Sequence, residues 1–340
     1  MNDRALSLLE QYDIEVLRTR KGRGTFVCET KNGNLCFQEY SGNPEKLKLQ
    51  QKVLERIRNL GLVNGEELMT TKEGLLYVKD GDGICYILKT YFEGMECNIY
   101  DNKECVEAAQ LLARLHHCLD CVWFKESEED GQNMEMVLLQ RHLPLQEYEK
   151  HNRELMRVRT YLKKKSQKQV FEAELLQVMD YFIDQARRVT ENWKAVVEES
   201  GPNREQVQGE CICHGDYQYH NILKTAEGWR IVNFEKIQLD DPVRDLYLFM
   251  RKVMEKNNWS ICQGQEILGA YTAIRSLDLY SGRDLYYRFA YPEKFWKIVN
   301  FYYNSPKSWI PEKNLKKLET VVEQEKMKEK FLKEVLSGGL

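Results

Sequence analysis

Residues 214–236, HGDYQYHNILKTAEGWRIVNFEK, limit what this chain can fold into more than any other stretch. They place a histidine, an aspartate and an asparagine in the spacing H-x-D-x(4)-N, and a second apolar segment then runs into Asn233. Phosphoryl transfer needs a carboxylate that orients the attacking hydroxyl and oxygen ligands that hold magnesium against nucleotide phosphates. The stretch therefore raises the question of whether it forms a working phosphotransfer site or a degenerate one.

Length and composition set the broad class. A chain of 340 residues suits two unequal lobes or domains, and 42% hydrophobic residues, 30% charged residues and a net charge of -3 are typical of an ordinary globular protein. We expect no nucleic-acid partner from this charge balance. The N-terminus lacks a basic start followed by an apolar stretch, and no apolar run approaches membrane-spanning length. We expect a soluble, intracellular protein without a membrane span.

The first ninety residues have the pattern of a small antiparallel sheet with one inserted helix. Turn residues at 31–34 and 80–83 separate alternating apolar segments, and the helix expected between Asn43 and Gly61 has its apolar positions on one face. Asn43 is a candidate cap and Gly61 a candidate helix end. The expected strands are 13–18, 24–29, 35–40, 75–79 and 84–89.

The character of the chain changes after Gly94, where long helical periods begin. We therefore predict an α+β fold in which residues 1–93 form a β-rich lobe ending in a hinge and residues 94–340 form a larger, mainly helical lobe. Short strands are expected on either side of the H-x-D-x(4)-N stretch, the second being GWRIVNF. The expected helices are 102–118, 171–199, 242–255, 261–278, 283–303 and 312–335.

Cysteines form two close pairs, Cys118/Cys121 and Cys211/Cys213. One CxxC beside one CxC lacks the paired ligand spacing of a typical zinc module, so we expect no zinc. Cys211 and Cys213 alternate on an expected strand, which is typical of reduced thiols that pack as small apolar side chains and favours a reducing compartment. The histidines that a zinc site would have combined with these pairs are His116, His117 and His214.

A five-stranded lobe with a helix after its third strand, followed by a helical lobe that carries this loop, is the architecture of the protein-kinase-like fold. The chain resembles the aminoglycoside phosphotransferase and choline kinase branch, in which the loop begins HGD. More narrowly, it is similar to the CotS family of spore-coat proteins. The segments that carry this resemblance are YFEGMECN (91–98), LARLHH (112–117), HGDYQYHNIL (214–223) and DPVRDLYLFMRKVMEKNNW (241–259).

The resemblance implies ATP and Mg²⁺ as possible cofactors, other spore-coat proteins as partners, and the spore coat as the destination after cytoplasmic synthesis. Asp216 matches the catalytic base, and Asn221, five residues later, matches a metal ligand. His214 and Asp245 match residues that organise the loop rather than react. Ordinary loop, turn or helix-cap roles remain the alternative for these residues.

Two departures from the resemblance weaken the expected chemistry. Catalysing relatives have an aspartate where this chain has Asn233, although Glu235 would point to the same side in an extended strand and supply the charge. At the strand-three lysine position the alignment places Gln38, with Glu55 as a weak candidate for its helical glutamate and an ordinary exposed charge as the alternative. A charge pair at ~4 Å is worth about 4 kcal/mol, so losing the lysine costs on the order of a thousandfold in rate.

Two hypotheses follow. The favoured one is a degenerate kinase that acts as a structural or interaction component of the spore coat, with a cleft that is degenerate or binds a nucleotide or small-molecule ligand without turnover. The alternative is an ATP- and Mg²⁺-dependent phosphotransferase acting on a small hydroxyl compound. An aromatic-rich stretch at 286–303 is interpreted as core packing of the helical lobe, with exposed rings for protein contacts or sugar stacking as the alternative.

Overall fold

The computed structural model describes residues 3–22, 24–120, 143–201, 211–304 and 311–337. Cys121, a member of the CxxC pair, lies outside these residues. The chain forms two compact units, which are described separately below. The first comprises Met1–Arg141, Glu210–Phe249 and Ala273–Arg275, and the second comprises His142–Gly209, Met250–Thr272 and Ser276–Leu340.

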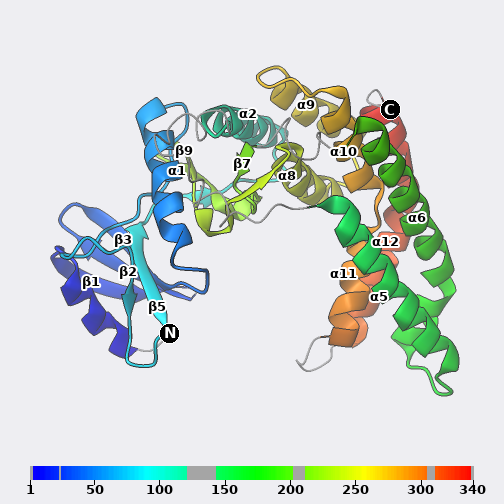
Figure 1. Ribbon diagram of the computed structural model, residues 1–340, viewed down its shortest axis with the longest axis horizontal. Coiled ribbons are helices and arrows are strands. Elements are labelled where there is room, and N and C mark those ends of the chain that lie inside the picture. The colour runs from blue at the N-terminus through cyan, green and yellow to red at the C-terminus, as the bar shows by residue number, and fades with distance from the viewer. Residues whose placement is uncertain (1–2, 23, 121–142, 202–210, 305–310, 338–340) are drawn as a thin grey trace. The chain divides into compact units, whose positions relative to one another are not determined.

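The N-terminal part of the first unit is an antiparallel sheet in the order β1-β2-β3-β5-β4, with the helix α1 beside it (Figure 1). The predicted strands are confirmed within a few residues. Asp80 closes the last hairpin because its Oδ1 accepts hydrogen bonds from the backbone N–H groups of Asp82 and Ile84. The elements are the 3₁₀ helix η1 (Asp3–Gln11), β1 (Val16–Lys21), β2 (Thr25–Thr30), β3 (Gly33–Glu39), α1 (Lys46–Leu60), β4 (Val78–Lys79) and β5 (Cys85–Thr90).

Helix α1 forms where the apolar periodicity predicts it. Leu47, Val53 and Ile57 are buried on one face, and Gly61 ends the helix with a left-handed φ of 63°. Its start differs slightly from the prediction: the Asn43 side chain accepts from the backbone N–H of Glu45, in a turn that precedes the helix.

The rest of the first unit carries the H-x-D-x(4)-N loop between short strand pairs. β6 pairs with β8 and β8 with β9, while β10 pairs with β7. The β6–β8 pairing links the segment after residue 93 to the loop, so the two compact units do not separate at the expected boundary of 93/94. The elements are β6 (Met95–Glu96), α2 (Asn102–Cys118), β7 (Cys211–Cys213), η2 (Tyr219–Asn221), β8 (Ile222–Thr225), β9 (Gly228–Ile231), η3 (Phe234–Lys236) and β10 (Gln238–Asp240).

The second unit is helical. One expected helix, 283–303, is wrong: Pro292 cannot continue a helical hydrogen-bond ladder, and two helices form on either side of it. No described helix is long and apolar enough to cross a bilayer. The helices are α5 (Pro144–Lys164), α6 (Val170–Ser200), α9 (Ile261–Thr272), α10 (Leu279–Ala290), α11 (Glu293–Asn304) and α12 (Pro311–Phe331) with the π-helical turn Leu332–Leu336, and α8 (Val243–Lys256) has residues in both units.

The aromatic-rich stretch mostly packs inside the second unit, as its core interpretation predicts. Tyr291 stacks on Tyr148 with ring centroids 4.2 Å apart, and Phe295 stacks on Phe182 at 4.3 Å. Phe301 is the exception, with 55% of its surface exposed. The rings of this stretch therefore serve mainly to join helices α5, α6, α10 and α11.

Candidate functional site

The H-x-D-x(4)-N loop lies entirely within the first compact unit and begins with a turn that only glycine fits. Gly215 has a φ of +78°, and a Cβ on it would lie 2.0 Å from the backbone oxygen of Lys236. The loop is therefore pressed against the segment that follows β9. This contact explains why the motif has glycine between His214 and Asp216.

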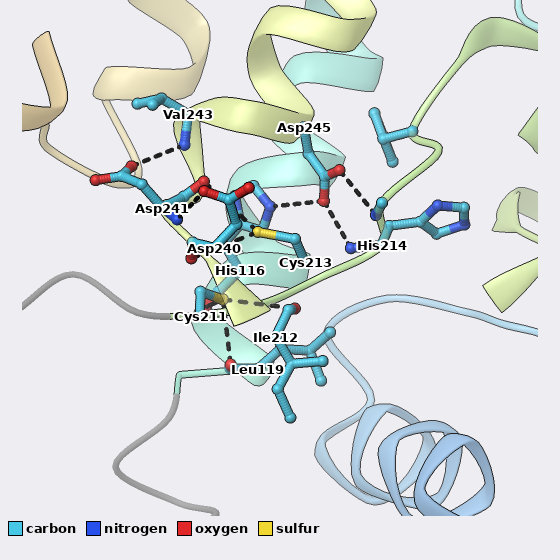
Figure 2. Close-up of polar contacts among 12 residues, drawn as sticks. His116, Leu119, Cys211, Ile212, Cys213, His214, Asp240, Asp241, Val243 and Asp245 are labelled. Atoms are coloured by element: carbon cyan, nitrogen blue, oxygen red, sulfur yellow. Dashed lines mark hydrogen bonds and ion pairs between the residues drawn. The ribbon is translucent and has the colours of Figure 1, made fainter. Parts of the chain in front are cut away.

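Asp245, at the start of α8, is hydrogen-bonded to the start of the loop (Figure 2). Its Oδ2 accepts from the backbone N–H of His214 at 2.6 Å, and its Oδ1 accepts from that of Gly215 at 3.0 Å. His116 Nε2 lies 3.3 Å from Oδ2. Burial alone would raise the pKa of Asp245, but the His116 contact and the neighbouring donors lower it, so the carboxylate is charged.

His214 joins the loop to the end of the β9 segment. Its Nδ1 accepts from the backbone N–H of Asp216 at 3.2 Å, so the ring proton of the neutral form is on Nε2, which lies 3.0 Å from the Val232 carbonyl oxygen. The positions of His214 and Asp245 agree with the organising roles that the resemblance implies, and we keep those roles as a proposal.

Asp216 is half-buried and already has two partners. Lys236 Nζ donates to its Oδ2 at 2.8 Å, and the Gln218 side-chain amide donates to its Oδ1 at 2.5 Å. Burial acts to raise the pKa of Asp216, but the hydrogen bond and charge of Lys236 outweigh it and lower the pKa. The carboxylate is therefore ionised, as a base position requires, and is paired with an exposed lysine.

The two amides at the expected metal positions are bonded to each other. Asn233 Nδ2 donates to Asn221 Oδ1 at 2.8 Å, and Asn221 Nδ2 donates to the backbone oxygen of Asp216 at 2.8 Å. The Asn221 oxygen that would face a metal is thus an acceptor within the protein. Asn233 itself has a left-handed φ of 67° and caps η3.

Glu235 also lies at this position, but the strand argument that placed it there is wrong. β9 ends at Ile231, and Glu235 lies in the 3₁₀ helix η3 rather than in an extended strand. Its Oε1 accepts from Gln38 Nε2 at 2.9 Å, so the strand-three residue does reach the site. The curvature of η3, and not strand alternation, brings the carboxylate beside Asn233.

A lysine that the motif reading missed sits among these residues. Lys89 of β5 donates to Glu235 Oε1 at 2.6 Å and to Asn233 Oδ1 at 2.8 Å, and it forms an ion pair with Glu66 Oε2 at 3.0 Å. Burial opposes the charge of Lys89, but Glu66 and Glu235 outweigh it and raise the pKa of Lys89. Lys89 also holds the pKa of Glu235 down against the effect of burial.

Glu66 lies in the connection after α1 and fixes the backbone of the metal segment, residues 233–235. Its two carboxylate oxygens accept from the backbone N–H groups of Asn233 at 2.9 Å and Phe234 at 3.1 Å. Glu55, the expected helical glutamate, lies elsewhere, in a groove of about 370 Å³ that Lys48 and Tyr77 also line. At the site, Lys89 therefore pairs with Glu66 and with Glu235.

Three side chains that could bind a metal, from α2, β7 and α8, lie close together. His116 Nε2, Cys213 Sγ and an Asp245 carboxylate oxygen lie within 4.8 Å of one another (Figure 2). Burial raises the pKa of the Cys213 thiol, so it is protonated, and its sulfur lies 3.7 Å from the Asp240 carbonyl oxygen. A cysteine binds zinc as the thiolate, and structural zinc sites have four ligands. The cluster fits a hydrogen-bonded core better than a metal centre.

Solved structures of small-molecule kinases share this fold. An aminoglycoside phosphotransferase from Alicyclobacillus acidocaldarius has a TM-score of 0.78 at 17% identity, covering 97% of this chain and 95% of the other. The spectinomycin phosphotransferase APH(9)-Ia with ADP and spectinomycin has 0.64 at 12%, covering 100% and 99%. Choline kinase from Cryptosporidium parvum has 0.51 at 12%, covering 99% and 97%. These identities establish a shared fold alone.

The sequence comparison is more specific. No curated protein sequence matches the chain. The family described as "Spore coat putative kinase YutH" matches residues 6–335, which is nearly the whole chain. The expected α+β kinase-like fold and the resemblance to spore-coat kinases of the CotS type are confirmed, and the chain belongs to the Spore coat putative kinase YutH family.

Proposed function

We propose that the protein is a kinase-fold component of the spore coat whose site is degenerate and acts in structure or interaction rather than in phosphoryl transfer. The observation that carries this proposal is that the two amides expected to bind the metal are hydrogen-bonded to other side chains of the protein. Asn233 donates to Asn221 Oδ1 and accepts from Lys89. Other spore-coat proteins are the proposed partners, and the family description supports the coat location.

The charges around the site support a lack of catalysis. Magnesium in kinases is held by at least one carboxylate together with the phosphates, because a hard divalent cation needs negative oxygen ligands. Here the two candidate ligands Asn221 and Asn233 are neutral, and the carboxylate of Glu235 is paired with Lys89. Gln38 is neutral at the strand-three position. The residues present therefore do not fit a magnesium–nucleotide site.

A second candidate function, ATP- and Mg²⁺-dependent phosphorylation of a small hydroxyl compound, is favoured by Asp216. This carboxylate stands at the base position, is partly buried and has a lowered pKa, so it is ionised at neutral pH. Solved structures with this fold include phosphotransferases and kinases, and one of them holds ADP and spectinomycin. A nucleotide or small-molecule ligand is proposed here only as the alternative.

The discriminating experiment measures ATP consumption by the purified chain over a panel of hydroxyl compounds, beside thermal shifts with ATP, with and without Mg²⁺. We expect no turnover above that of Asp216→Asn, and no Mg²⁺-dependent shift. Asp82→Asn, in an exposed hairpin turn, is the matched control. Turnover in the native chain and in Asp82→Asn that disappears in Asp216→Asn would overturn the proposal.

A second test uses spores. We expect the chain to be recovered in the coat fraction, and we expect a strain that carries only the Asp216→Asn variant to assemble its coat as the parent strain does. A coat that requires the native carboxylate would show that phosphoryl transfer, rather than the folded protein, supplies the function.

A further inference from the structure

Lys89 has an environment that is unusual for a lysine. It lies in β5 directly after the apolar run Tyr86-Ile87-Leu88, and only 3% of its surface is exposed. Strand β5 pairs with β3 so that Lys89 stands opposite Cys36, and Gln38, two residues along β3, therefore shares its face of the sheet. The ammonium group emerges from the sheet beside Asn233.

The Lys89 ammonium has three side-chain oxygens within 3.0 Å: it donates hydrogen bonds to two of them and forms an ion pair with the third. These are Asn233 Oδ1 at 2.8 Å, Glu235 Oε1 at 2.6 Å and Glu66 Oε2 at 3.0 Å. A lysine ammonium has three N–H donors and no more. Lys89 therefore cannot contact a nucleotide phosphate without giving up one of these contacts, two of which are to carboxylates that are themselves mostly buried.

The ammonium meets the same side chains that were expected to hold magnesium. Asn233 presents its oxygen to Lys89 and its N–H to Asn221, and Glu235 turns the carboxylate that would replace the missing charge toward Lys89 as well. A divalent ion at these oxygens would stand beside a fixed positive charge, in a poorly hydrated environment where repulsion is weakly screened.

We propose that the Lys89 ammonium is a built-in cation that takes the place of the divalent metal, joining Asn233, Glu235 and Glu66 and excluding metal ions from the site. This inference rests on the proposed function, because it gives the reason that the site is degenerate. Lys89 is a positioning residue: its contacts hold η3 and the Glu66 connection in place without the metal that the kinase fold otherwise uses.

The test removes the lysine ammonium and restores a metal-binding carboxylate. In the double variant Lys89→Met/Asn233→Asp the built-in cation is removed and a carboxylate is restored, and aspartate tolerates the left-handed backbone at 233 as asparagine does. Mn²⁺ is the probe, measured by calorimetry and by electron paramagnetic resonance without nucleotide. We expect the double variant to bind Mn²⁺ at least about 100-fold more tightly than the native chain.

Single variants separate the lysine from the new carboxylate. Asn233→Asp alone keeps Lys89, which pairs with the added charge, so its Mn²⁺ affinity should stay within about threefold of the native value. Asn258→Asp is the matched control, since Asn258 is exposed and also has a left-handed φ, of 47°. Equal Mn²⁺ affinity in Asn233→Asp and in the double variant would show that Lys89 does not exclude the metal and would overturn the proposal.

Two further outcomes also overturn it: tight Mn²⁺ binding by the native chain that Asn221→Ala abolishes, and a folded double variant that binds no better than the native chain. If the double variant folds only when Mn²⁺ is present, its melting temperature should rise steeply with Mn²⁺ while that of Asn258→Asp does not. The assays contain no nucleotide, so a chain that consumes ATP but excludes Mn²⁺ on its own overturns the proposed function and not the role of Lys89.

Discussion

Two buried charges in the first compact unit are held in opposite ways. Asp245 of α8 is an anion, and its contacts come from two backbone N–H groups and from His116. Lys89 of β5 is a cation, and its contacts are all side-chain oxygens, two of them from carboxylates. The contacts of Asp245 include fixed backbone dipoles as well as His116, whereas the contacts of Lys89 are side chains alone.

The difference explains which half of the site keeps the family pattern. Two of the partners of Asp245 are backbone N–H groups of the His214-Gly215 turn, and these persist whatever side chains the metal segment carries. Lys89 instead requires the carboxylates of Glu66 and Glu235. The support of the loop is thus independent of the metal chemistry, and that chemistry can be lost while the fold remains.

The largest expected effect is at Asp245. Asp245→Asn turns an NH₂ group toward one of two backbone N–H donors in a fully buried position, so we expect a loss of about 4 kcal/mol in the free energy of unfolding, measured in urea. Asp278→Asn is the matched control: Asp278 caps α10, and asparagine caps equally well, so the change should stay below about 0.5 kcal/mol. If Asp245→Asn cost as little unfolding free energy as Asp278→Asn, the proposed distinction between Asp245 and Lys89 would fail.

Lys89 comes next. Lys89→Met leaves the carboxylates of Glu66 and Glu235 without their cation, and we expect a loss of about 3 kcal/mol in the free energy of unfolding. The loss should be smaller than at Asp245, because Glu235 has 21% of its side chain exposed and regains water. Lys79→Met, on the exposed side of β4, is the control and should change stability little. A larger loss at Lys89 than at Asp245 would contradict this order.

The third prediction concerns pH. Burial raises and Lys89 lowers the pKa of Glu235, with a net decrease, so its ion pair stabilises the fold above the unfolded-state pKa and is lost as pH falls through the folded-state pKa. We expect Glu235→Gln to cost about 1 kcal/mol in unfolding free energy at pH 7 and progressively less below pH ~4.5. The exposed Glu73→Gln should show no such convergence with the native chain. Parallel native and Glu235→Gln curves down to acid pH would refute the titrating contact.

The smallest expected effect is at Lys236. Its side chain is 67% exposed, so Lys236→Met should change the unfolding free energy by less than about 1 kcal/mol. The pKa of Asp216 should nevertheless rise, because Lys236 is the main group that lowers it, and carbon-13 NMR of the carboxyl group would follow this. An unchanged Asp216 pKa would mean that the contact does not persist in solution.

Much of this structure was predictable from the sequence because its signals are local. Turn residues and alternating apolar positions predict the sheet, and the loop spacing locates Asp216, Asn221 and Asn233. The break at Pro292 was equally visible, since a proline disfavours helix in the residue before it, but the expected helix 283–303 runs through that proline.

The partners of the metal segment were not predictable in this way. Lys89 and Glu66 lie more than a hundred residues before Asn233 and belong to no motif, and only the folded sheet brings them to it. One signal was present: a lysine inside the apolar run CYILKT is costly to bury unless an anion meets it. Without the register of β3 and β5, the sequence does not say which anion that is.

The left-handed backbone of Asn233 limits which residues position 233 can carry. Asparagine and aspartate are the non-glycine residues that adopt this conformation most readily, so a single codon change at 233 exchanges amide for carboxylate without rebuilding the turn. Either residue offers an oxygen to Lys89. A substitution at 233 can therefore change the charge beside Lys89 while the turn into η3 keeps its backbone conformation.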